Sequence, residues 1–460
     1  MARSPRGALR SAIVRSRSFR ARAWTLFRVA WVSVAAVSLA AQVSSNRFDR
    51  QVQAYVRNGD FSGSVLVAKD DHVLFQKSYG MANYEWNIPN SENTKYHIAS
   101  VTKTFTAAAI LKLDREGKLR LSDPLSKYVP DFLNGERITI EQLLTHTSGL
   151  PDFYSLPEYP IKKYQRVTLA DLIAWVKTKP LDFLPGSKSS YSNTGYGFLA
   201  YIIEQVSGEP YEEYVAEAIL KPAGMKETGT YRDETLIPGR ASGYQPALGD
   251  HGLRNAPAYD KAILTGSASM YSTSSDLLQW GRALQSGKLI DLQGIPYGWN
   301  ARESRGKHKY IEQDGRAPGF VSHVSFFPDH HLTVIVLGNL EDAAVNVLAD
   351  DLAAIALGEN PRLPAPRGSL KESVSRPDEF VGTYEVNPAL LLDIRADGES
   401  LAMRGTGGDY LPLEPIGKDA FFYRQLYVKV TFRRDKAGKI EALLWNGDVP
   451  CKKLSDKPRP

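Results

Sequence analysis

The fold is decided by residues 100–113, SVTKTFTAAAILKL, which carry a helical pattern. Apolar side chains recur there mostly at spacings of three and four, from Val101 through Phe105 to Leu111, until Gly117 ends the run. This period places them on one side of an α-helix. Other elements must cover a helix this apolar, so we expect it at the centre of the protein.

Strand patterns lie on both sides of this helix in the sequence. Before it, Gly63–Ala68 and Val73–Ser78 predict a hairpin, and after it come Tyr310–Glu312, Val321–Phe327 and Leu332–Leu337. Between them, residues 138–290 alternate helical segments with loops, which indicates an all-helical lobe, and a helix at Asp342–Leu357 closes the domain. The sequence therefore predicts an α+β sandwich in which strands from both ends share one sheet.

The composition changes near residue 360. Three prolines fall within residues 360–367, so residues 360–376 have the composition of a linker. From residue 377 to 460, short alternating strands separated by turns predict a small all-β domain, either an antiparallel barrel or a sandwich. The larger first domain then spans residues 42–359.

The first 41 residues differ in charge from the rest of the chain. They hold eight arginines, no lysine and no acid, so the net charge of +6 becomes +6 − 8 = −2 over residues 42–460. An apolar run at 29–41 ends in the small-x-small pattern of residues 38–40, as in a secretory signal peptide. We therefore expect a periplasmic or secreted protein. With about 13 residues, the run is shorter than the roughly 20 that span a membrane, so an uncleaved anchor is the lesser alternative, as is an organelle transit peptide.

The composition also bears on partners and cofactors. Without the leader's charge, nothing supports a nucleic-acid partner or an anionic membrane surface. Cys451 is the single cysteine, which excludes an intramolecular disulfide, and no histidine pair has zinc spacing on a helix. We expect no cofactor and no metal, and a small-molecule or peptide substrate as partner. Membrane contact is expected only through the leader, and the sequence does not indicate an oligomeric state.

Two side chains suited to nucleophilic chemistry open the apolar helix. Ser100 and Lys103 are three residues apart, so a helix places them next to each other. A serine hydroxyl becomes a good nucleophile when a base takes its proton, and a buried lysine of lowered pKa can be that base. The pattern is common by chance, because Ser304-Arg305-Gly306-Lys307 repeats it in what we interpret as an exposed loop. Alone, Ser100 is explained equally well as a helix cap beside a surface lysine.

A second motif, Tyr191-Ser192-Asn193, favours the catalytic interpretation. A phenol near a lysine can relay a proton to a leaving group, and an asparagine amide can orient both the lysine and a substrate carbonyl. With both motifs, the sequence resembles the serine β-lactamase and penicillin-binding-protein-like family, in the branch of class C β-lactamases, D-aminopeptidases, D-Ala-D-Ala carboxypeptidases and related esterases. The resemblance runs from about Phe48 to Leu357 and includes the segments 143–151, 207–211, 222–225 and 272–277.

This resemblance implies a fold and a set of roles. The fold is a helical lobe packed on a mixed α/β sheet, with the site between them. Ser100 corresponds to the acylated serine, Lys103 to its base partner and Tyr191 to the proton relay, while Asn193 positions the substrate. For His146, within Thr-His-Thr-Ser-Gly, we expect a structural hydrogen-bonding role rather than catalysis.

The third family motif, Lys or His followed by any residue and Gly, reads Gln313-Asp314-Gly315 here. The resemblance implies that Gly315 lets the substrate lie against a strand and that the backbone N–H of Arg316 is the second oxyanion donor. Gln313 replaces the usual cation or imidazole, which leaves the substrate class open among D-amino-acid peptides, β-lactams and small esters. Two alternatives remain: a catalytically weak peptidoglycan- or β-lactam-binding protein of the same fold, and a structural cell-envelope module that recognises its partner through the C-terminal domain.

Overall fold

The computed structural model describes residues 45–459 except 71, 233, 248–251, 288, 291–296, 363, 365–373, 375, 388–389, 407 and 447–448. The expected leader at residues 1–41 and much of the expected linker at 360–376 lie outside the described residues. Contacts divide the chain into residues 1–50 and residues 51–460, and the strands and helices named below all belong to the second part. Among the described residues, no helix is both long and apolar enough to cross a membrane.

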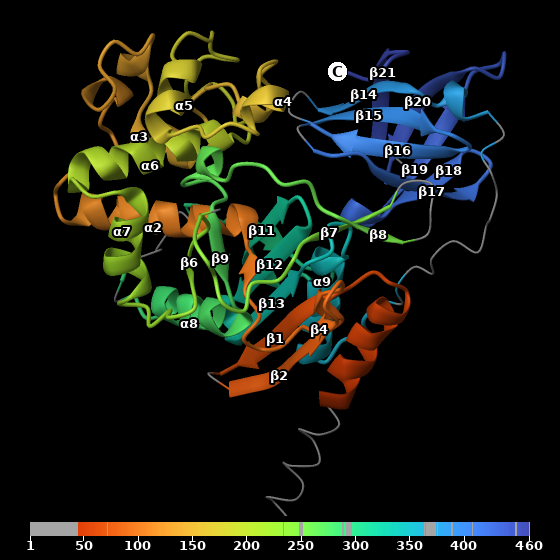
Figure 1. The fold of residues 1–460 in the computed structure, drawn as a ribbon, viewed down its shortest axis with the longest axis horizontal. Coiled ribbons are helices and arrows are strands. Elements are labelled where there is room, and N and C mark those ends of the chain that lie inside the picture. Colours follow the sequence, from red (N-terminus) through yellow and green to blue (C-terminus); the bar gives the residue numbers. More distant parts are fainter. Residues whose placement is uncertain are drawn as a thin grey trace, which may run out of the picture. The chain divides into compact units, whose positions relative to one another are not determined.

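The central sheet joins strands from both ends of the first domain (Figure 1), as the sequence predicts. Its order is β10-β11-β12-β13-β1-β2, and every neighbouring pair is antiparallel. Strands β1 and β13 pair directly, with Val65 opposite Val336, and this pairing joins the strands from the two ends of the domain. The strands are β1 (Gly63–Lys69), β2 (His72–Tyr79), β10 (Asn300–Glu303), β11 (Lys309–Ala317), β12 (Phe320–Phe327) and β13 (Leu332–Gly338).

The middle strands of this sheet are buried on both faces. Every residue of β12 and β13 is buried, so alternate residues pack in opposite directions. Ile335 and Leu337 join the main apolar core, whereas Val334 and Val336 are buried outside that core. Helices α8 (Ser274–Gln285) and α9 (Val345–Ala356) both contact β13 and cover the sheet.

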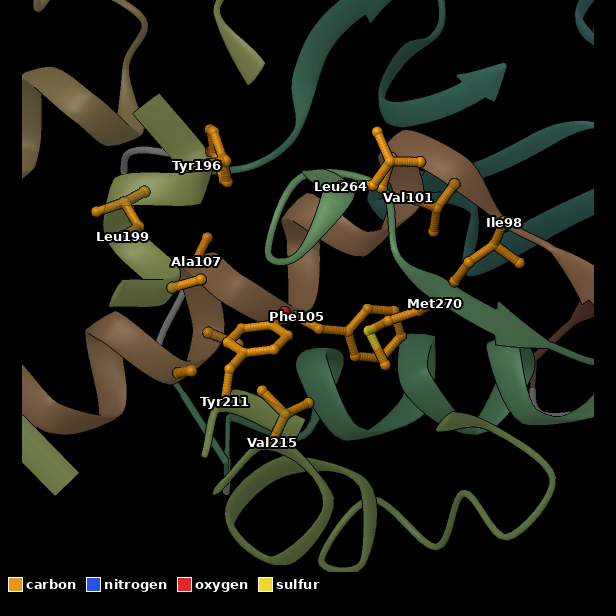
Figure 2. Packing of buried hydrophobic residues seen from close by; sticks show 14 of the residues in the cluster. Ile98, Val101, Phe105, Ala107, Tyr196, Leu199, Tyr211, Val215, Leu264 and Met270 are labelled. Carbon is orange, nitrogen blue, oxygen red and sulfur yellow. The ribbon is translucent and has the colours of Figure 1, made fainter. Parts of the chain in front are cut away.

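Helix α2 (Thr102–Arg115) runs through the middle of the helical lobe, and its residues from Thr102 to Ile110 are all buried. Phe105 stacks on Trp280, with ring centroids 4.4 Å apart, and Figure 2 shows it among other core residues. The expected central apolar helix is therefore present. The lobe also contains α3 (Ile140–Leu144), α4 (Tyr159–Lys162), α5 (Leu169–Val176), α6 (Asn193–Ser207) and α7 (Tyr211–Val215), which continues into a π-helical turn (Ala216–Leu220).

Residues 138–290 are not all-helical as expected, because short strands form within the long connections there, and similar short strands precede that segment at residues 81–97. One small sheet has the order β5-β9-β6, and two further pairs are β3–β4 and β7–β8. These strands are two or three residues long, too short to show an alternating pattern in the sequence. They are β3 (Met81–Asn83), β4 (Ile88–Pro89), β5 (Tyr96–His97), β6 (Gly229–Thr230), β7 (Tyr244–Pro246), β8 (Leu253–Asn255) and β9 (Met270–Ser272).

The C-terminal strands close into an antiparallel barrel in sequence order, and β14 pairs with β21. Of the two architectures expected from the sequence, the structure has the barrel. Its interior holds an aromatic cluster around Phe380, Phe421 and Phe432, together with the buried Cys451. The strands are β14 (Gly382–Asn387), β15 (Leu390–Asp397), β16 (Ser400–Gly405), β17 (Leu411–Gly417), β18 (Ala420–Tyr423), β19 (Val428–Arg434), β20 (Ile440–Trp445) and β21 (Val449–Ser455).

Candidate active site

Ser100 lies in a tight turn directly before α2. A 3-10 turn covers Ala99–Val101, and Ala99 has a left-handed backbone with φ +44°. Strand β11 packs against this turn: a side-chain carbon at Gly315 would lie 2.3 Å from the Ile98 carbonyl oxygen and 2.9 Å from the Ser100 nitrogen. Only glycine permits this approach. The sheet thus determines where the turn that carries Ser100 lies.

Lys103 is buried one helical turn further on, with an exposed fraction of 1%. Its Nζ lies 3.2 Å from Ser100 Oγ, 2.8 Å from Asn193 Oδ1 and 2.9 Å from the Ser267 carbonyl oxygen. Burial lowers the pKa of Lys103 to about 7, although nearby carboxylates raise it in part. The unprotonated amine that a general base requires is therefore well populated near neutral pH.

Tyr191 reaches the same hydroxyl from the other side. Its Oη donates to Ser100 Oγ at 2.9 Å, and its ring lies 4.7 Å from Lys103 Nζ. The residue is 45% exposed, but its hydroxyl points at Ser100. Desolvation raises the pKa of Tyr191 well above its ordinary value. The phenol thus keeps its proton and can donate it, which leaves the lysine as the better base.

Asn193 is held by contacts at both ends of its amide. Its Oδ1 accepts from Lys103 Nζ, while its Nδ2 and backbone N both donate to Asp152 Oδ2 at 2.9 Å. The residue opens helix α6 because the Ser192 hydroxyl accepts from Gly195 N at 3.2 Å and caps the first turn.

Sequence reasoning did not identify Asp152. It follows directly after the segment 143–151 that contributes to the family resemblance, but no spacing rule connects it to Asn193, 41 residues further on. The one local signal is an acidic residue before Phe153–Ser155, a helical turn that it caps by accepting from Tyr154 N at 3.0 Å.

These groups open into a single cleft of about 630 Å³. Ser100, Tyr191 and Asn193 line it together with Gln313 and Arg316. Lys103 and Gly315 are not among the residues that line it, although Lys103 contacts both Ser100 and Asn193. The wall is rich in tyrosine and also includes residues of the C-terminal barrel. Besides Tyr191, the tyrosines are Tyr154, Tyr159, Tyr164 and Tyr259, and the polar barrel residues include Asp409 and Gln425.

The chain matches the Beta-lactamase family over residues 48–358. It belongs to this family of serine hydrolases. It is 31% identical over 315 residues to the putative penicillin-binding protein PbpX of Bacillus subtilis strain 168, covering 66% of this chain and 77% of that protein. A penicillin-binding protein from Bacillus halodurans has a similar structure, with 29% identity and a TM-score of 0.58 over 67% of this chain and 98% of the other.

A third similarity concerns the fold alone. The D-amino acid amidase from Ochrobactrum anthropi SV3, solved with D-phenylalanine, is 22% identical, with a TM-score of 0.62 over 68% of this chain and 99% of the amidase. This beta-lactamase-family fold therefore occurs in proteins whose names refer both to penicillin binding and to amide hydrolysis.

In the third motif of this beta-lactamase-family site, Gln313 and Arg316 line the cleft. Gln313 is 4% exposed; its Nε2 donates to the Asp314 carbonyl oxygen at 3.0 Å, and its Oε1 accepts from Asn300 Nδ2 at 3.4 Å. Because Gly315 has no side chain, the Ser100 turn can pack against it. Gly315 is not among the residues that line the cleft. Arg316 lines the cleft, and its buried Nη1 has no hydrogen-bond partner among the described residues.

The remaining candidates take structural positions. His146 Nδ1 accepts from Ser192 N at 3.1 Å, and its ring lies 4.6 Å from the Tyr191 ring. Burial, with the charge of Lys103, lowers the pKa of His146 to about 3, so the ring is neutral. The second Ser-x-x-Lys copy lies in a loop whose Lys307 is exposed. No cluster of three or more His, Cys, Asp or Glu suited to a metal ion occurs within the described part of the chain.

Proposed function

We propose that this protein is an exported serine hydrolase that cleaves amide or ester bonds through an acyl-enzyme on Ser100. The observation that carries the proposal is the position of one hydroxyl between two proton-transfer groups, 3.2 Å from Lys103 Nζ and 2.9 Å from Tyr191 Oη. The lysine has a pKa lowered to about 7 and serves as the base. The tyrosine keeps its proton and serves as the relay.

In the proposed reaction, the Ser100 proton moves to neutral Lys103 while Oγ bonds to the substrate carbonyl carbon. The carbonyl oxygen takes up the negative charge, and the backbone N–H groups of Ser100 and Arg316 are its proposed donors. The bond to the leaving nitrogen or oxygen then breaks as that atom takes a proton from Tyr191, which regains one from the Lys103 ammonium. Water attacks the acyl-enzyme with the same base, which releases a carboxylic acid and restores Ser100.

We propose D-amino-acid peptides or amides, β-lactams and small esters as substrate classes. The names of a penicillin-binding relative and of an amidase of the same fold support this choice. A cleft of about 630 Å³ with tyrosine walls suits a substrate with an apolar or aromatic group. The neutral Gln313 favours neutral substrates over anionic ones within this set.

We also propose export to the periplasm or beyond the cell, with cleavage near residue 41. The arginine-rich start and the apolar run at residues 29–41 support this. The amino-terminal sequence of the protein recovered from the native host tests the proposal. A protein that begins near residue 42 is the expected result, and an intact start in a cytoplasmic fraction would contradict it.

Covalent labelling with a fluorophosphonate or a tagged penicillin tests the reaction. We expect the wild type to be labelled on Ser100, at a rate that rises as the pH increases through about 7 because Lys103 must lose its proton. Ser100→Ala should abolish labelling without loss of thermal stability, because only a hydroxyl is removed.

Ser304→Ala is the matched control, because Ser304 belongs to the other Ser-x-x-Lys sequence, in the loop with the exposed Lys307. It should label like the wild type. Reversible binding of penicillin by the wild type without any covalent label would contradict the hydrolase and support a binding protein of the same fold.

A further inference from the structure

Asp152 is a carboxylate whose two oxygens both accept hydrogen bonds from the protein. Oδ1 accepts from Tyr154 N at 3.0 Å, and Oδ2 accepts from the backbone N and the side-chain Nδ2 of Asn193, each at 2.9 Å. These donors are all N–H groups, which bind the ionised form of a carboxylate best. Burial raises the pKa of Asp152 above its ordinary value, although the three hydrogen bonds and the charge of Lys103 lower it in part.

The contacts of Asp152 determine which way the Asn193 amide points. An ionised carboxylate only accepts hydrogen bonds, so the end of the amide that faces it must be Nδ2. The other end, Oδ1, is then directed at Lys103 Nζ, 2.8 Å away. A reversed amide would place Nδ2 against the ammonium and Oδ1 against the carboxylate, and both contacts would be repulsive.

We propose that Asp152 is a positioning residue of the hydrolase: it locks the Asn193 amide toward Lys103 and holds a negative charge beside the proposed base. The inference rests on the proposed function of Ser100 and Lys103. Asp152 itself need not touch the reacting atoms, because its effect reaches them through Asn193 and through its charge.

The charge effect has a defined sign. Burial lowers the pKa of Lys103 to about 7, and the negative charges of Asp152 and Asp314 each raise it. Removing one negative charge makes the ammonium less stable, so Lys103 loses its proton at lower pH. The titratable groups that face Lys103 are Asp152 before α4, Asp314 on β11, His146 after α3, Tyr191 before α6 and Tyr196 on α6.

Besides the two carboxylates, whose charges raise the pKa of Lys103, these groups are neutral near pH 7. The pKa of His146 is lowered to about 3, so its ring is neutral, and burial raises the pKa of both tyrosines. A shift caused by Asp152 can therefore be separated from the others by substitution.

The test is the pH profile of acylation at Ser100, measured as the labelling rate in the full-length protein. Asp152→Asn keeps an oxygen that can accept from Asn193 but removes the negative charge. We expect the acidic limb of its pH profile to move to lower pH, and its plateau labelling rate to stay close to that of the wild type. Asp152→Ala also releases Asn193, so its plateau should fall by about tenfold or more. In an Asn193→Ala background, Asp152→Ala should cost much less, because the two residues act as a unit.

Asp182→Asn is the matched control, because Asp182 lines the same cleft but interacts with Lys188 rather than Lys103. Its acidic limb should match that of the wild type. Melting temperatures of all variants identify any loss caused by misfolding, and the isosteric Asp152→Asn keeps the test decisive if Asp152→Ala does not fold.

The outcomes distinguish a failure of this inference from a failure of the proposed function on which it rests. A wild type that is not labelled at Ser100 contradicts the hydrolase itself. If the wild type is labelled, two results would overturn only the role of Asp152. One is an acidic limb of the pH profile that does not shift in Asp152→Asn. The other is a loss of labelling rate on Asp152→Ala that is equal in the presence and absence of Asn193.

Discussion

Gln313 occupies the position at which the family pattern places a cation or an imidazole beside the substrate. Its amide is already engaged by the Asp314 carbonyl oxygen and by Asn300. A charge-assisted hydrogen bond contributes roughly 1.5–3 kcal/mol and a neutral one about 1 kcal/mol. Anionic substrates should therefore bind about tenfold or more weakly than they would beside a lysine, whereas neutral esters lose less.

We expect the wild type to hydrolyse short-chain activated esters clearly and penicillins weakly, and Gln313→Lys to raise the ratio of penicillin to ester turnover. The measurement is kcat/KM for both substrates in both proteins. Gln313→Met is the control, because it is of similar length but adds no charge, and it should not raise the ratio. If the wild type prefers penicillins, another group selects the substrate. The first candidate is the Arg316 guanidinium in the same cleft, whose buried Nη1 has no hydrogen-bond partner among the described residues.

At the scale of elements, the contact between β11 and the Ser100 turn couples the sheet to the proposed nucleophile. Gly315→Ala places a carbon 2.3 Å from the Ile98 carbonyl oxygen, so the strand or the turn must move. Such overpacking costs typically about 1–3 kcal/mol. We expect Ser100 labelling to fall by more than the stability loss explains, because a small misplacement of a nucleophile slows its reaction strongly.

Labelling rates and melting temperatures check this expectation. Gly417→Ala in the barrel is the control, because a carbon there meets only the Ala420 side chain at an ordinary 3.6 Å. A Gly315→Ala variant that labels at the wild-type rate would show that the turn does not depend on the strand.

The elements differ in how far the sequence predicts them. Strands with continuous apolar or alternating patterns, such as β12 and β13, were predicted to within one residue. Strand β11 extends to Ala317, five residues beyond the expected Glu312. The sequence does not indicate this extension because Gln313-Asp314-Gly315 has no alternating pattern. The segment is a strand because it pairs with β12. Pairing and burial, rather than local pattern, decide such segments.

The residues of the site also differ in how far the sequence predicts them. Ser100, Lys103, Tyr191 and Asn193 carry motifs, and the structure brings them together, although Ser100 precedes α2 in a 3-10 turn rather than opening the α-helix. Asp152 carries no motif, and its contact with Asn193 arises only when distant segments fold together. Likewise, the close approach at Gly315 is a tertiary contact, which no pattern along one chain can indicate.

The barrel and the sheet domain share a buried ion pair. Arg424 Nη1 donates to Asp60 Oδ1 at 2.8 Å, and the two side chains are 3% and 0% exposed. Arg424 also donates to Glu414 within the barrel. Breaking a buried pair by removing one partner costs about 3–5 kcal/mol, because the other charge stays buried without compensation. This pair therefore holds the barrel to the domain that precedes it.

Limited proteolysis tests both the expected boundary before the barrel and the contact that holds the barrel to the sheet domain. We expect cleavage within residues 360–376, where prolines interrupt the chain, and we expect the two fragments of the nicked wild type to elute together in gel filtration. Arg424→Ala should let them separate, because it removes the buried ion pair between Arg424 and Asp60 that joins the two parts. Arg433→Ala is the control: its pair with Glu441 is 54% and 44% exposed and contributes only about 0–1 kcal/mol, so its fragments should stay together. Resistance to cleavage would show that the boundary is misplaced, and fragments of nicked Arg424→Ala that remain associated would show that other contacts hold the barrel.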